Sequence, residues 1–191
     1  MLDVARLLFA ELGYDATTNR AIAEASGITP GAIYHYFDSK AELYAAVYEE
    51  IYDRVFTTLE EAIADEPTLL DQFAAAIVAA GELNVQDPTL PAFDRGVSAE
   101  ARRHPELNEL LRPLRRRNTR FFRRMVAAAV ERGELAPDVD RRSLEDLLNA
   151  VAFGLVRISA VTGDNRRTAG AVRALQRFLD GTLVSSRNRR F

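Results

Sequence analysis

The sequence has no cysteine, only two histidines and a single lysine among its 191 residues. Without cysteine the chain forms neither a disulfide nor a thiolate metal site, which suits a reducing compartment. Of the two histidines, His35 lies on the helix expected over residues 29–37, and His104 precedes Pro105 at a helix boundary, with no adjacent serine or pair of acids at a spacing known from catalytic sites. The sequence therefore predicts no catalytic residue, no metal site and no cofactor, and it argues against an enzyme.

Long apolar runs are also missing. The apolar run over residues 147–161 contains Asn149 and Arg157, and it falls short of the ~20 residues that a membrane-spanning helix needs. Nothing in the sequence resembles a signal peptide. The formal net charge of −3 excludes a generally basic protein that coats nucleic acid, so any nucleic-acid contact has to be local. These features predict a cytoplasmic protein with no membrane partner.

The sequence contains helical patterns throughout, with no alternating strand pattern and no Asn-Gly hairpin signal. We therefore predict an all-α protein of about nine helices. Glycine and proline mark most of the breaks, at Gly27, Gly81, Gly133 and Gly163 and at the pair Pro88 and Pro91. The expected helices cover about residues 2–14, 18–26, 29–37, 39–64, 68–81, 92–103, 105–133, 141–161 and 165–184. We expect two domains, 1–47 and 48–191, with the fourth helix as a rigid joint between them.

The second and third expected helices have the pattern of a helix-turn-helix unit. Their apolar residues can share one small core only if the chain reverses at Gly27, and these residues are Ile22, Ala23, Ile28, Ile33 and Phe37. Thr29 followed by Pro30 is a strong helix start. The threonine hydroxyl accepts a hydrogen bond from a backbone N–H, and proline fits the first helical position because no N–H is needed there. With Ile33 and Phe37 facing inward, the outward residues are Gly31, Ala32, Tyr34, His35 and Tyr36, and Lys40 follows them.

Residues 2–47 resemble the N-terminal domain of the tetracycline-repressor (TetR) family of bacterial transcription regulators. The matching segments are the first helix ending in Gly13-Tyr14, the Thr-Thr start, Gly-Ile-Thr-Pro-Gly-Ala-Ile-Tyr-His-Tyr-Phe, and Ser-Lys-Ala-Glu-Leu. The resemblance implies a repressor that binds a palindromic, double-stranded DNA operator. It implies phosphate or base contacts from Thr18, Arg20, Thr29, Tyr34, Tyr36 and Lys40, with Pro30, Gly31, Ala32 and His35 facing the bases. Thr18 and Thr29 could instead serve only as helix caps, and Tyr34 could wedge helices together.

The charge of this segment departs from the family pattern. Residues 1–47 hold three basic and six acidic side chains, and three minus six gives a net charge of −3. DNA binding usually relies on basic residues, because neutralised phosphates release their counterions. Family members commonly have a short basic segment before the first helix, and this chain opens directly in that helix at Met1. The alternative is a TetR-like, ligand-binding dimer that does not bind an operator.

The last two expected helices carry more apolar residues than one neighbouring helix would cover. Their stripes are Leu144, Leu147, Leu148, Val151, Leu155, Ile158 and Val161, then Val172, Leu175, Phe178, Leu179 and Leu183. In the TetR family these two helices pair with their symmetry mates, which implies a homodimer whose two reading helices lie about one DNA turn apart, ~34 to 36 Å. An ordinary hydrophobic core is the alternative.

The resemblance also implies a small-molecule effector, of a class that the residues do not define. The expected pocket lining is Phe56, Leu59, Phe73, Ile77, Phe93, Val97, Phe121, Met125, Asn149, Phe153 and Arg157. Each apolar member could equally be plain core, and Arg157 could pair with a carboxylate at the dimer interface. The seventh helix adds Arg112, Arg115, Arg116, Arg117, Arg120, Arg123 and Arg124, which we interpret as a solvated face rather than a second nucleic-acid patch.

Overall fold

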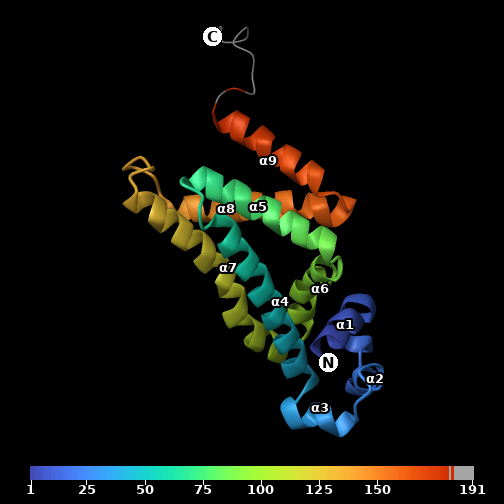
Figure 1. Ribbon diagram of the computed structural model, residues 1–191. Helices are drawn as coiled ribbons and strands as arrows, with labels where there is room; N and C mark the ends of the chain where they lie inside the picture. The colour runs from blue at the N-terminus through green and yellow to red at the C-terminus, as the bar shows by residue number, and fades with distance from the viewer. Residues whose placement is uncertain (181, 183–191) are drawn as a thin grey trace. The chain divides into compact units, whose positions relative to one another are not determined.

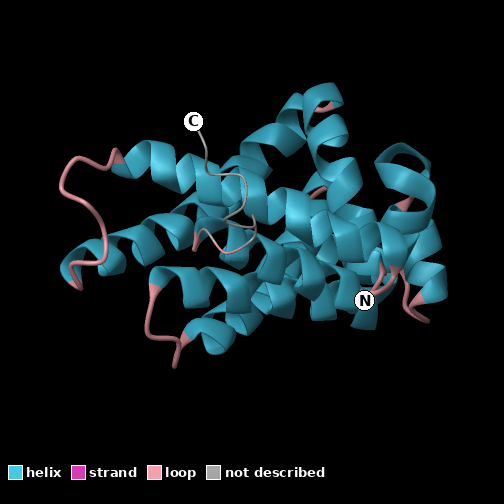
Figure 2. Cartoon of the chain, turned by 90° about the horizontal axis from the view of Figure 1, so that it is seen from above, coloured by secondary structure: helices cyan, strands magenta, loops and turns pink. Residues whose placement is uncertain are grey.

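The computed structural model describes residues 1–180 and 182, and these residues form nine helices and no strand (Figures 1 and 2). The all-α prediction is therefore confirmed. None of the described helices is long and apolar enough to span a membrane. The helices are α1 (Leu2–Ala16), α2 (Asn19–Ala25), α3 (Pro30–Tyr36), α4 (Lys40–Ile63), α5 (Leu69–Gln86), α6 (Thr89–Arg103), α7 (Pro105–Glu131), α8 (Arg141–Thr162) and α9 (Asn165–Leu179).

The chain divides into two compact units. The first contains Met1–Phe56 and Asp87–Asn118, and the second contains Thr57–Gln86 together with the chain from Thr119 onward. Helices α4 and α7 each contribute residues to both units. A domain boundary after residue 47 remains a prediction.

The first unit has an aromatic core between α1, α4 and α6. The ring of Tyr44 lies 4.8 Å from that of Phe9 and 4.6 Å from that of Phe93, measured between centroids. Ile22 and Ile33 are completely buried and fix α2 and α3 to this unit. These aromatic contacts position the N-terminal helices, because edge-to-face and stacked pairs at such distances stabilise by about 0.5–1.5 kcal/mol each beyond simple burial.

The second unit is organised around α5, which packs against α8 and α9. We expected α5 to end near Gly81, and this prediction is wrong, because the helix continues to Gln86. A Cβ atom at Gly81 would lie 2.0 Å from Oδ1 of Asn165, so the glycine allows the start of α9 to approach α5 closely. The Asn165 side chain donates to the carbonyl of Val78 at 3.2 Å and fixes this approach.

Helix α6 begins three residues earlier than the expected start at Ala92. Pro91 falls in its first turn, where a missing backbone N–H costs nothing, so the proline does not break the helix. Helix α9 ends at Leu179, short of the expected end at Val184, and Leu183 and Val184 lie outside the described residues.

Candidate nucleic-acid interface

Helices α2 and α3 form the predicted helix-turn-helix unit, closed by a glycine turn. Gly27 has a φ of +68°, a conformation that side-chain-bearing residues rarely adopt. The N–H of Gly27 donates to the carbonyl of Glu24 at 3.1 Å, and the N–H of Ile28 donates to that of Ala23 at 3.0 Å. These two bonds satisfy the last carbonyls of α2 and turn the chain towards α3.

Both helices carry the threonine caps that the sequence suggested. The Thr18 hydroxyl accepts from the N–H of Ala21 at 3.1 Å, and the Thr29 hydroxyl accepts from the N–H of Ala32 at 3.3 Å. Both threonines are exposed, and each hydroxyl keeps its own hydrogen for donation to another group. Capping and phosphate contact are therefore compatible roles for the same side chain.

The outward side of α3 is open to solvent. Ile33 is 0% exposed, whereas Tyr34 is 58% and Tyr36 is 72% exposed, and His35 between them is exposed as well. A wedging role for Tyr34 is not supported by this geometry. Ile28, which we expected in the core, is 37% exposed, and Phe37 is half-buried. Ile33 thus fixes α3 while the polar ends of the aromatic side chains on the opposite side remain available.

The other predicted contact residues are on the same helix-turn-helix unit. Pro30 and Gly31 are exposed at the start of α3, and Ala32 is half-buried. Arg20 is exposed on α2 and forms no ion pair within the part of the chain that the structure describes. Because the side chains at the start of α3 are small, the backbone there lies close to the surface and can approach the edges of the bases.

Lys40 differs from the other predicted contacts, because its ammonium group is already bound within the protein. It donates to the carbonyls of Tyr14 at 2.7 Å and Thr17 at 3.0 Å, and it lies 4.3 Å from the centroid of the Tyr14 ring. A cation at the carboxyl end of α1 satisfies carbonyls that the helix leaves unpaired. This anchoring role is not evident from the sequence, and a phosphate contact by Lys40 remains a prediction.

Four of the seven arginines on the arginine-rich face of α7 form ion pairs with acidic residues. Within the first unit Arg112 pairs with Glu109 at 2.9 Å, and Arg117 pairs with Asp53. Within the second unit the pairs are Arg123 with Glu145 and Arg124 with Glu60. These contacts support our interpretation of this face as a solvated surface rather than a second nucleic-acid patch.

The residues predicted to line an effector pocket are divided between the two units. Phe56, Phe93 and Val97 belong to the first unit, and all three are buried. In the second unit Leu59, Phe73, Ile77, Phe121 and Met125 are buried as well, and Asn149 is half-buried. Phe153 is 67% exposed and Arg157 is also exposed, so neither is buried within a single chain.

A group of polar side chains beside the aromatic core was missed by the sequence reasoning. Tyr44, Tyr48 and Tyr52 follow one another at a spacing of four along α4, and the Tyr48 and Tyr52 ring centroids lie 4.3 Å apart. Burial raises the pKa of all three phenols, that of Tyr52 to about 12. Burial also raises the pKa of Asp94 on α6. The spacing of four between the tyrosines is the sequence signal that places them on one face of the helix.

Helices α8 and α9 expose large apolar side chains within the described chain. Exposed fractions reach 57% for Leu147, 70% for Val161, 62% for Phe178 and 58% for Leu179. Apolar side chains exposed together on neighbouring helices mark contact surfaces in soluble proteins. Val172, by contrast, is buried within the chain, so only part of the predicted stripe is available to a partner.

Two family patterns match this chain. The first, described as "Bacterial regulatory proteins, tetR family", covers residues 1–47 and thus the whole helix-turn-helix unit. The second, described as "Tetracyclin repressor-like, C-terminal domain", covers residues 70–177.

Two transcriptional regulators align with this chain over nearly its full length. The transcriptional repressor KstR2 of Rhodococcus jostii is 31% identical over 98% of this chain and 91% of its own length. The regulator UidR of Escherichia coli K12 is 26% identical over 97% of this chain and 92% of its own.

Solved structures share the fold. Salmonella enterica GusR superposes with a TM-score of 0.76 at 28% identity, over 95% of this chain and 92% of its own. FadR of Bacillus subtilis, solved with stearoyl-CoA, has a TM-score of 0.75 at 19% identity, over 96% of this chain and 97% of its own. At that identity the likeness to FadR concerns the fold alone.

Proposed function

Because this chain belongs to the TetR family of bacterial regulatory proteins and is a helix-turn-helix transcriptional regulator, we propose that it represses genes from a palindromic operator and is released by a small apolar effector. Such a regulator is not an enzyme, and it works where the bacterial DNA is, in the cytoplasm. The observation that carries the proposal is the outward side of α3, with Tyr34 and Tyr36 exposed opposite the buried Ile33.

On the proposed DNA-binding surface, backbone atoms of α3 approach the bases and side-chain hydroxyl groups contact the phosphates. Gly31 and Ala32 bring the start of α3 to the base edges in the major groove, beside Pro30 and His35. The hydroxyls of Thr18, Thr29, Tyr34 and Tyr36 donate to phosphate oxygens, and Arg20 supplies the positive charge on this surface. With a net charge of −3 over residues 1–47, the unit depends on these hydrogen bonds more than on counterion release.

The proposed assembly is a homodimer formed through α8 and α9. The exposed side chains Leu147, Val161, Phe178 and Leu179 support it, because pairing with a second copy removes their apolar surface from water. A two-fold dimer presents one reading helix to each half of a palindrome. Replacing Leu147 and Phe178 by Glu together is expected to yield monomers in sedimentation velocity, with operator affinity lost in parallel.

The proposed effector is a small molecule with a substantial apolar part. The supporting side chains are the buried aromatic and methionine residues of the predicted lining, among them Phe73, Phe121 and Met125. The structure of FadR with stearoyl-CoA shows that this fold accommodates a long apolar ligand in another protein.

The alternative is a ligand-binding dimer of the same fold that does not bind an operator. Its support is the acidic charge of residues 1–47. Titration of the intergenic DNA upstream of the gene, followed by fluorescence anisotropy at several salt concentrations, separates the two. A regulator gives saturable binding, and Arg20→Ala reduces the slope of log affinity against log salt by about 0.9.

The matched control is Arg112→Ala, which removes an exposed arginine of α7 that pairs with Glu109. Its salt slope is expected to equal that of the unmodified protein. An equal loss in the Arg112 variant would assign DNA binding to the arginine face of α7 instead. Absence of binding at low salt would favour the alternative function.

A further inference from the structure

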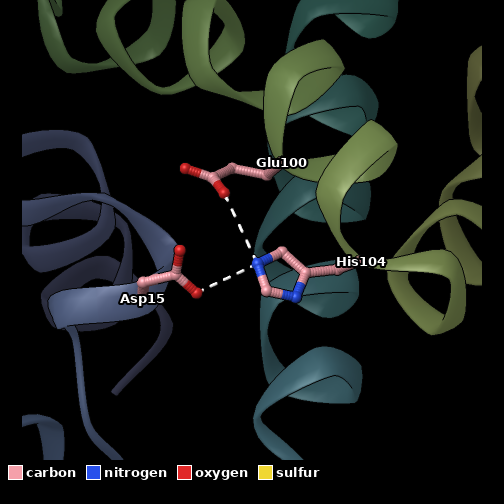
Figure 3. Close-up of side chains that lie close together, drawn as sticks. All are labelled: Asp15, Glu100 and His104. Carbon is pink, nitrogen blue, oxygen red and sulfur yellow. Dashed lines mark ion pairs between the residues drawn. The ribbon is translucent and has the colours of Figure 1, made fainter.

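Three side chains that can ligate a metal meet where the carboxyl end of α1 faces the carboxyl end of α6. Nε2 of His104 lies 2.9 Å from Oδ1 of Asp15 and 3.8 Å from Oε2 of Glu100 (Figure 3). The three candidate ligand atoms all lie within 4.8 Å of one another. Glu100 and His104 are four residues apart, so both project from one side of α6 towards Asp15.

Two of these atoms are buried and lack a hydrogen-bond partner. Glu100 is only 8% exposed, and its Oε2 has no donor among the described residues. Nε2 of His104 likewise has no partner there with hydrogen-bond geometry, despite the short distance to Asp15. An unpaired buried carboxylate oxygen costs about 1–3 kcal/mol or more. Both atoms point to one position, and a cation there would satisfy them together.

The neighbouring charges leave these atoms available to a cation. Arg103 pairs with the other oxygen of each carboxylate, Oδ2 of Asp15 at 3.3 Å and Oε1 of Glu100 at 3.4 Å. On the other side of the imidazole, Nδ1 of His104 faces Oε1 of Glu106 at 3.6 Å. When Nε2 binds a metal ion, a carboxylate at this position can accept the Nδ1 proton and orient the imidazole, as the outer partners of metal-binding histidines do.

We propose that Asp15, Glu100 and His104 bind a divalent transition-metal ion, with zinc as the best match. One imidazole nitrogen and two carboxylate oxygens at about 2.0–2.2 Å are ordinary zinc ligands, and two such bonds at a tetrahedral angle place the ligand atoms about 3.4 Å apart. The observed separations of 2.9 Å and 3.8 Å bracket that value. The imidazole disfavours magnesium and calcium, which prefer all-oxygen sites.

Metal binding would join two helices of the first unit. Asp15 is in the last turn of α1, two residues before Thr17, and His104 ends α6. The ion therefore ties the segment that leads into α2 to the end of α6. At a zinc concentration one hundred times the Kd, the folding equilibrium constant of this unit rises about a hundredfold.

The test is calorimetric titration of zinc chloride into the full chain, freed of metal by a chelator and carrying no histidine tag. We expect saturation at one zinc per chain, and His104→Ala to weaken binding by at least about tenfold. Asp15→Asn provides a second variant, which we expect to fold like the unmodified protein because this side chain is 59% exposed. His35→Ala, which removes the only other histidine, is the matched control and retains zinc affinity.

The proposal is overturned if the unmodified protein binds no zinc, or if neither His104→Ala nor Asp15→Asn weakens binding. In the first case the cluster is an ion-paired histidine only. No DNA is present in this measurement, so its outcome is independent of the proposed operator binding.

Discussion

Asp87 joins three helices of the first unit, and we expect its replacement by Asn to destabilise the protein by about 2 kcal/mol at pH 7. One carboxylate oxygen, Oδ2, accepts from Nη1 of Arg6 at 2.6 Å and from Nη1 of Arg54 at 2.9 Å. The other oxygen, Oδ1, accepts from Thr89 at the start of α6. Arg6 and Asp87 side chains are only 11% and 16% exposed, so solvent screens this pair weakly.

The magnitude follows from the pKa of Asp87. Burial alone would raise this pKa, but the hydrogen bonds from Thr89, Arg6 and Arg54, together with the charge of Arg6, lower it from 3.8 to about 2. A difference of about 1.8 pKa units at about 1.36 kcal/mol each corresponds to roughly 2 kcal/mol. Because the folded-state pKa is the lower one, the stabilisation is complete above about pH 5 and is lost as the pH falls towards 2.

The assay is urea unfolding of the unmodified protein and of Asp87→Asn at a series of pH values. The difference in unfolding free energy is expected to be largest at pH 7 and to fall to about half by pH 3. Asp138→Asn makes the same chemical change at an exposed residue that forms no ion pair among the described residues, and it should have no such effect. A difference between Asp87→Asn and the unmodified protein that stays constant from pH 7 to pH 3 would refute the assignment.

Three further predictions concern the helix-turn-helix unit and Lys40, which follows it. Lys40→Met is expected to lower the unfolding free energy by about 2 kcal/mol in urea unfolding, because the carbonyls of Tyr14 and Thr17 lose a charged donor; unchanged stability would contradict the anchoring role. Gly27→Ala should cost about 1 kcal/mol in the same assay through its positive φ alone, since an added Cβ meets no atom of the described residues within 4 Å; a neutral result would refute this. Gly31→Ala should leave stability the same or slightly higher, since its Cβ finds ordinary space, yet weaken operator binding in an anisotropy titration; undiminished affinity would show that the backbone at 31 does not approach the bases.

The local features of the helix-turn-helix unit were predictable from the sequence. The caps at Thr18 and Thr29, the turn at Gly27 and the buried Ile33 all depend on residues within a few positions of one another. Ile28 was predicted wrongly, because apolar spacing identifies a face but does not show whether another element covers it. Gly81 was misread for a related reason, since a glycine that ends a helix and one that admits a neighbouring helix look identical in sequence.

The contacts of Lys40 and His104 could not be predicted in this way. Lys40 binds a carbonyl 26 residues away, and Arg103 pairs with Asp15 across 88 residues. Such contacts depend on how α1 packs against α6 and α4, which local patterns do not specify. The shortage of histidine argued against a metal site. A count of histidines, however, does not show which carboxylates the fold places beside His104.

The single lysine of this sequence makes the chain a convenient subject for chemical labelling. An acylating reagent that attacks lysine side chains has one target in this sequence, Nζ of Lys40. Since Nζ of Lys40 is held by the carbonyls of Tyr14 and Thr17, its acylation should proceed only when the end of α1 detaches from the start of α4. The rate of that acylation, followed by mass spectrometry of the tryptic fragments, therefore measures how often the contact between the end of α1 and the start of α4 breaks.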